Sequence, residues 1–95
     1  MKSIEEIFDE ITATLKSKQH DYATDESPFK NFQTSASMLG CRPEDVIVTN
    51  LAQKVSRISN LISENRSPKF EALNDSINDL IGYAILLRQW NDTKR

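Results

Sequence analysis

The chain has 95 residues, with twelve basic and fourteen acidic side chains, a formal net charge of −2 and a single cysteine. Its length predicts one small domain, residues 1–95, which buries only roughly 60 to 68% of the surface of its unfolded chain. The charges are mixed without a basic run, which excludes the class of duplex nucleic-acid binders. The lone Cys41 excludes an intrachain disulfide and a cysteine metal site.

The first ten residues, MKSIEEIFDE, carry acidic side chains where a signal peptide needs an apolar core. No apolar stretch approaches the roughly eighteen residues that a membrane span requires. We therefore expect a soluble, cytoplasmic protein with no membrane partner.

The first predicted helix covers about residues 3–18. Ser3 and Glu6 form a capping box, and apolar residues then recur at helical spacing from Ile4 to Leu15. The segment QHDYATDESP, residues 19–28, is predicted to be a loop. A short second helix follows Ser27 and Pro28 and ends at Gly40.

The third predicted helix begins at Pro43 and continues to about residue 64. The fourth covers about residues 70–90 and is followed by a polar tail, residues 91–95. These elements predict an all-α domain of four helices. Because so small a core gains by sharing an apolar face with another copy, we expect a homo-oligomer that forms a larger helical bundle.

Three carboxylates, Glu71, Asp75 and Asp79, recur at a four-residue spacing on the fourth helix. Like charges so placed repel each other by a few tenths of a kcal/mol per pair. One interpretation is a solvated outer face. The other is a cation site, because no basic residue interrupts the helix from Glu71 to Leu87. Oxygen ligands alone suit Mg²⁺ or Mn²⁺ held together with substrate phosphates.

On the third helix, Asn50, Lys54 and Arg57 form a strip at the edge of the apolar face. The two cations either pair with carboxylates of the neighbouring helix or bind a phosphate. Gly82 costs about 1 kcal/mol relative to alanine in a helix interior. Close packing of another helix explains it better than close approach of a flat ligand.

Four segments in this order, KQHDY, NF, KVSRISNL and EALNDSINDLIGYA, resemble a phage-associated family of small helical proteins described as nucleotide-modification-associated. The resemblance spans residues 18–87. It implies a fold similar to the all-α nucleoside-triphosphate pyrophosphatases of the MazG type, in which subunits form a bundle and carboxylates hold magnesium against a nucleotide. Carried over, the site residues are Lys18, Asp21, Tyr22, Asn31, Phe32, Lys54, Arg57, Glu71, Asp75, Asp79 and Tyr83.

The chain departs from the MazG pattern, because those enzymes place an E-E-x-x-E cluster opposite an E-x-x-D, whereas Glu71 and Asp75 here are spaced at four residues rather than three. The third helix here has Lys54 and Arg57 instead, so half of a two-metal site is missing. Binding a phosphate-bearing ligand needs less: cations, carboxylates or amides, and an aromatic ring such as Tyr22 or Tyr83 to stack on a base.

Three functional hypotheses follow. The first is a phage or prophage protein that binds a nucleotide or nucleotide-derived signal between the third and fourth helices and sequesters a host defence signal. It assigns metal binding to Glu71, Asp75 and Asp79. The residues assigned to ligand binding are Lys18, Asp21, Tyr22, Asn31, Phe32, Asn50, Lys54, Arg57, Asp79 and Tyr83. The second is a metal-dependent pyrophosphohydrolase, and the third is a helical protein-interaction module.

Overall fold

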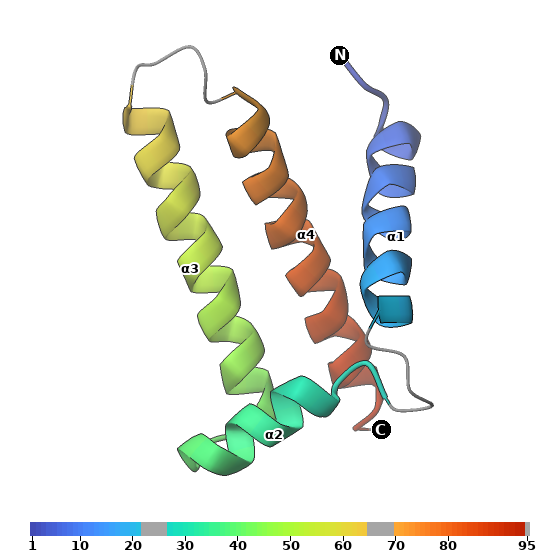
Figure 1. The fold of residues 1–95 in the computed structure, drawn as a ribbon, viewed down its shortest axis with the longest axis vertical. Coiled ribbons are helices and arrows are strands. Elements are labelled where there is room, and N and C mark those ends of the chain that lie inside the picture. The colour runs from blue at the N-terminus through green and yellow to red at the C-terminus, as the bar shows by residue number, and fades with distance from the viewer. Residues whose placement is uncertain (22–26, 65–69, 95) are drawn as a thin grey trace.

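The computed structural model describes residues 1–21, 27–64 and 70–94, and for residues 18–21 and 70 it describes the backbone alone. Within these ranges the chain forms four helices and no strand: α1 (Ile4–Asp21), α2 (Lys30–Leu39), α3 (Pro43–Ser63) and α4 (Phe70–Asp92) (Figure 1). The predicted all-α fold is confirmed. The first helix extends three residues into the segment predicted to be a loop, where no glycine or proline interrupts it.

The predicted caps of the first two helices differ in outcome. Ser3 and Glu6 form the expected capping box, since the Ser3 hydroxyl accepts from the Glu6 N–H at 3.1 Å and the Glu6 carboxylate accepts from the Ser3 N–H at 3.3 Å. The Ser27 hydroxyl accepts from the Phe29 N–H, but α2 itself begins only at Lys30. Gly40 ends α2 in the left-handed conformation, with φ of 71°.

The start of α3 is fixed by an ion pair that the sequence reading did not identify. The Asp45 carboxylate accepts hydrogen bonds from the Arg42 backbone N–H at 3.0 Å and from the Arg42 guanidinium at 3.0 and 3.1 Å. Pro43 occupies the first helical position, where its missing N–H costs nothing. The Arg42 hydrogen bonds lower the pKa of Asp45.

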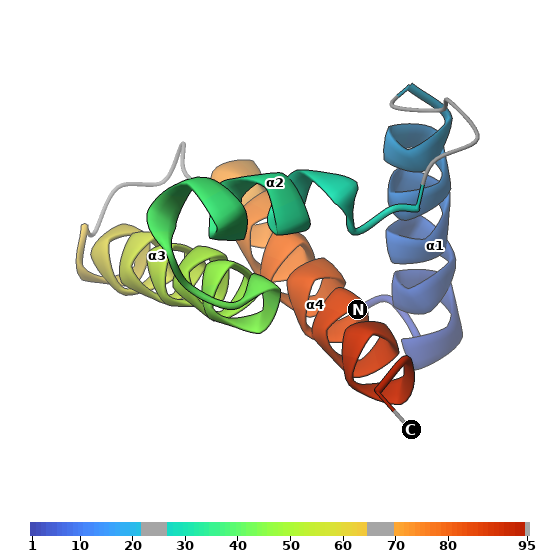
Figure 2. The ribbon, with the colours of Figure 1, turned by 90° about the horizontal axis from the view of Figure 1, so that it is seen from below.

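The helices α3 and α4 run antiparallel and make the most extensive contact in the molecule (Figure 1). The helix α2 lies across the start of α3, and α1 contacts α4 on its other side over a smaller area (Figure 2). As a result α4 is the central element, whereas α3 has no described helix on its outer side in either view.

The contact of α1 with α4 explains why a glycine occupies position 82 in the interior of α4. This glycine is buried, and a Cβ added to it would lie 3.5 Å from Cδ2 of Leu15 on α1. The side of α4 that carries Gly82 therefore packs against a helix, as the helix-packing interpretation predicted.

The core among the described residues is small. Ile47 is fully buried, Ile11 and Ala36 are 2% exposed, and Phe29 is 8% exposed. Phe29 packs against Trp90 with ring centroids 5.3 Å apart, so the start of α2 is held against the end of α4.

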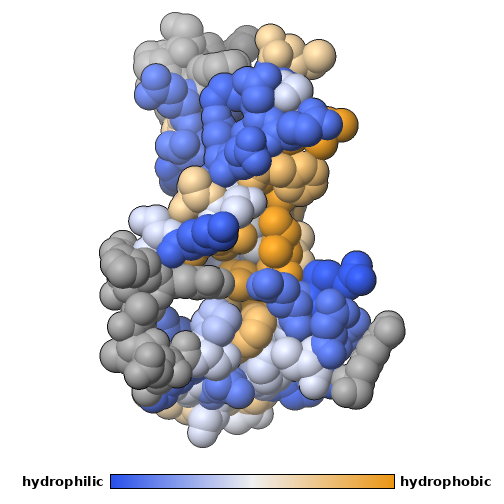
Figure 3. Space-filling model, turned by 90° about the vertical axis from the view of Figure 1, so that its right-hand side faces the viewer, coloured by the Kyte–Doolittle hydropathy of each residue, from blue (hydrophilic) through white to orange (hydrophobic). Residues whose placement is uncertain are grey.

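Several residues assigned to apolar helix faces in the sequence are exposed instead. On α1 these are Ile4 and Phe8, and on α3 they are Val48, Val55 and Ile62. Viewed from the side of α1, an apolar band runs between polar regions of the surface (Figure 3). The fold therefore leaves apolar surface without a cover inside one chain.

No helix in the described part of the chain combines the length and the apolar character that crossing a bilayer needs.

Candidate ligand site between α3 and α4

Two cations of α3 reach α4, and they find different partners there. Lys54 forms an ion pair with Asp79, with Nζ and Oδ2 3.1 Å apart and both side chains about a third exposed or less. Arg57 instead donates from Nε to the hydroxyl of Ser76 at 3.1 Å. The salt-bridge interpretation is therefore correct for Lys54 and wrong for Arg57, because Ser76 occupies the position that faces the guanidinium.

The Arg57 side chain is held by a buried hydroxyl while its charge is left uncompensated. Ser76 is 3% exposed, and Arg57 itself is exposed. The described residues contain no carboxylate paired with Arg57. A guanidinium fixed through Nε presents its remaining N–H donors in a plane, which is the geometry that binds phosphate or carboxylate through two parallel hydrogen bonds.

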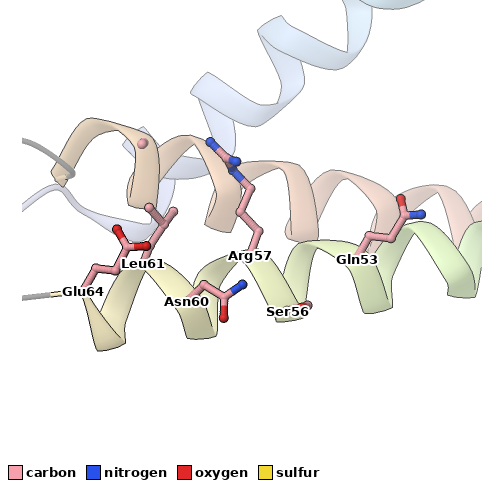
Figure 4. A pocket seen from close by; sticks show the side chains of 7 residues that line it. Gln53, Ser56, Arg57, Asn60, Leu61 and Glu64 are labelled. Carbon is pink, nitrogen blue, oxygen red and sulfur yellow. The ribbon is translucent and has the colours of Figure 1, made fainter.

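Arg57 lies in the wall of an open pocket of about 500 Å³ along α3 and the start of α4 (Figure 4). Pockets that bind small ligands usually measure about 300 to 1,000 Å³. The wall combines polar and apolar surface in similar amounts, and its residues are Gln53, Ser56, Arg57, Asn60, Leu61, Glu64 and Ala72. In Figure 4 the Arg57 guanidinium extends from α3 across α4.

Of these wall residues, only Arg57 is among the site residues predicted from the sequence. Gln53, Ser56 and Asn60 follow a helical spacing of three and four residues, and Arg57 shares their side of α3. That spacing was available as a signal. Neutral polar residues at this spacing are, however, also typical of a solvated helix face.

The three members of the predicted acidic triplet differ in burial and pairing. Glu71 and Asp75 are exposed, whereas Asp79 is partly buried and paired with Lys54. No group of three histidine, cysteine, aspartate or glutamate side chains that could hold a metal ion occurs within the described ranges. Magnesium or manganese at Glu71, Asp75 and Asp79 thus stays a prediction, and such an ion would need further oxygen ligands from a substrate or another chain.

The other predicted ligand residues lie outside the pocket wall. Asn50 and Tyr83 are half-buried on α3 and α4, while on α2 Asn31 is exposed and Phe32 is half-buried. No aromatic side chain is among the described residues that line the pocket. The expected stacking of a base on Tyr83 therefore has no support from the pocket.

Three predicted site residues cannot be assigned a side-chain position. Lys18 and Asp21 lie in the last turn of α1, where only the backbone is described, and Tyr22 lies outside the described residues.

A second polar cluster lies at the opposite end of the α3 and α4 pair. Glu44 accepts hydrogen bonds from Lys94 Nζ at 2.7 Å and from the Trp90 indole N–H, and Lys94 also lies 5.5 Å from the centroid of the Trp90 ring. The bonds from Lys94 and then Trp90 lower the pKa of Glu44 to about 2. Every charge in this cluster has a partner, so it is suited to holding helices together.

Comparison of the chain with protein-family models, with curated protein sequences and with solved structures finds no match. The resemblance to the phage-associated family and to the MazG type accordingly stays a prediction.

Proposed function

We propose that this protein binds a nucleotide, or a small signalling molecule derived from one, in the pocket between α3 and α4. The observation that carries the proposal is Arg57, a cation in the pocket wall with a buried hydroxyl holding its Nε and no carboxylate partner among the described residues. Its guanidinium would bind a phosphate of the ligand.

The neighbouring wall residues suit the rest of such a ligand. The amides of Gln53 and Asn60 both donate and accept hydrogen bonds, and the hydroxyl of Ser56 does the same. Groups of this kind can recognise the edge of a base or the hydroxyls of a ribose. The Lys54 and Asp79 pair lies on the same two helices and would add positive charge if the ligand drew Lys54 away.

Binding without hydrolysis is the version that the described residues favour. Two-metal hydrolysis needs a bridging set of carboxylates, and the described carboxylates of α4 do not form one. Combined with the resemblance to a phage-associated family, this supports sequestration of a host defence signal as the biological role.

The test is a mass balance. The protein is incubated with a pool of linear and cyclic nucleotides and Mg²⁺, then filtered, and the retained protein is boiled so that both fractions can be measured by mass spectrometry. We expect at least one compound to disappear from the filtrate and to return intact on boiling.

Two variants locate the binding. Arg57→Ala, and the double variant Lys54→Ala with Arg57→Ala, should release the retained compound. Arg88→Ala is the matched control, because Arg88 is an exposed arginine of α4 that pairs with Asp92 outside the pocket. Full retention by the double variant would reject this pocket.

The same measurement separates the alternatives. A triphosphate replaced by its monophosphate and pyrophosphate would make the protein a pyrophosphohydrolase. Retention of no nucleotide, with no rise in the melting temperature, would favour a helical protein-interaction module, since a ligand that binds the native state must raise that temperature.

A further inference from the structure

The outer side of α3 carries a continuous apolar stripe. Val48, Val55 and Ile62 are 50, 54 and 65% exposed, and they follow one another at seven-residue intervals, so they lie nearly in line along the helix. Leu51 and Ile58 fill the intervals and are half-buried. We call these five residues the α3 stripe. Their spacing is that of a helix whose apolar seam pairs with another helix, with β-branched residues at every seventh position.

The molecule exposes more surface than one compact chain should. A folded protein of 10.9 kDa has an accessible surface of about 5,600 Å², whereas this chain has 7251 Å². Its radius of gyration of 14.9 Å likewise exceeds the roughly 12 Å expected for a chain of this length. A stable protein complex buries about 800 Å² on each partner, which is less than the excess of the chain as a whole.

The chemistry of the α3 stripe favours a second copy of this chain as its partner. The stripe itself carries no charge; Ala52 and Ser59 on one side of it are small and neutral, and Lys54 on the other side is paired with Asp79. An identical stripe can therefore approach closely without opposing like charges. A nucleic acid or an acidic peptide would instead require cations along the seam.

We propose that two copies of the chain associate through the α3 stripe, with Val55 of one copy against Val55 of the other. Val48 and Ile62 lie seven residues on either side of Val55, so this register covers the whole stripe whether the two helices run parallel or antiparallel. In Figure 1 and Figure 2 no described helix lies beyond α3 on the side away from α4.

The proposed interface leaves the candidate ligand pocket accessible. Gln53 and Asn60 in the pocket wall are rotated from Val55 by about 160° and 140° around α3, at 100° per residue. The two pockets of a dimer would therefore open away from each other. The dimer does not depend on the proposed nucleotide binding, and each can fail without the other.

The first experiment measures the mass of the protein in solution by light scattering after size exclusion, from micromolar concentrations upward. The wild-type chain should form a dimer. Val55→Glu should be monomeric, because two buried like charges would meet at the centre of the seam, and its helical circular dichroism should match that of the wild type since Val55 is half exposed. Ile4→Glu is the control: it places the same charge on an exposed apolar residue of α1 and should leave the dimer intact.

The second experiment uses a short bis-maleimide cross-linker and avoids any effect of an added charge. In a Cys41→Ser background, Val55→Cys should give a covalent dimer in high yield, whereas Asn60→Cys, on the opposite side of α3, should not. A monomeric wild type, a dimeric Val55→Glu, or equal cross-linking at both positions would overturn the proposal. If Val55→Glu failed to fold, or if Ile4→Glu also dissociated, the cross-linking result would decide.

Discussion

The two ends of the α3 and α4 pair differ in how their charges are satisfied. At the end that includes Glu44, Trp90 and Lys94, each polar group has a partner and an aromatic pair packs beneath them. At the end that includes Arg57, a cation lies beside an open pocket and, within the described part of the chain, is held through a serine hydroxyl alone. The comparison indicates that the first end stabilises the fold and that the second is available to a ligand.

The largest expected effect is on the stability of the end that includes Glu44, Trp90 and Lys94, which we call the closed end. Trp90→Ala should lower the free energy of unfolding by about 2 to 3 kcal/mol, because it removes the packing on Phe29 and leaves Glu44 without the indole donor. Urea denaturation measures this. Trp90→Phe keeps an aromatic ring and should lose less. If the alanine variant unfolded at the same urea concentration as the wild type, the closed end would not be what holds the helices.

The next effect is on ligand affinity at the end that includes Arg57, which we call the open end. Arg57→Lys keeps the charge but loses the planar donors, so the affinity for the retained nucleotide should fall about tenfold, which corresponds to about 1.4 kcal/mol. Isothermal titration calorimetry on both proteins gives the ratio, and urea denaturation measures the stability that is lost because the buried Ser76 hydroxyl loses its Nε donor. Equal affinities would mean that only the charge of Arg57 matters and not its geometry.

A smaller effect is expected at Gly82, between the two ends. Gly82→Ala should stabilise the protein by up to about 1 kcal/mol, since the added Cβ would make an ordinary 3.5 Å contact with Leu15 and alanine favours the helix. Gly40→Ala is the matched control and should destabilise, because φ of 71° disfavours any side chain. Thermal unfolding of both variants should give shifts of opposite sign.

The smallest effect is on the pH dependence of stability. The pKa of Glu44 is about 2 in the folded chain against an ordinary value of 4.5, so the unfolded chain takes up the proton first as the pH falls. The contribution of Glu44 is complete above about pH 4.5 and is lost as the pH falls towards 2.

Replacement by a residue that does not titrate should reduce this dependence. The free energy of unfolding of Glu44→Gln should fall less steeply between pH 4.5 and 2 than that of the wild type. Lys94→Ala should flatten the same range, because Lys94 makes the largest contribution to the shift. An unchanged slope in both variants would show that the cluster does not form in solution.

The helices themselves could be predicted because their signals are local. The Ser3 and Glu6 capping box, Pro43 at a helix start and Gly40 at a helix end each act within one turn of the chain, and each occupies the expected place. Helical spacing of apolar residues likewise located all four elements.

The site was only partly predictable because it depends on which faces meet. The apolar period of α3 did not reveal that one side packs on α4 while Val48, Val55 and Ile62 face outward. Periodicity also did not indicate that Asp79 would face Lys54 while Ser76 would face Arg57, since that depends on the register between two helices. The contact of Trp90 with Glu44 joins residues 46 positions apart and was not anticipated.

The central place of α4 has a consequence for synthesis on the ribosome. The helix α1 packs on α4, and the Glu44 cluster of α3 closes only on Trp90 and Lys94. The first three helices are therefore synthesised before the helix on which α1 and α3 pack. Apart from the contact of α2 with α3, tertiary packing must wait until α4 has emerged, so the nascent chain depends on the solubility of its separate helices until then.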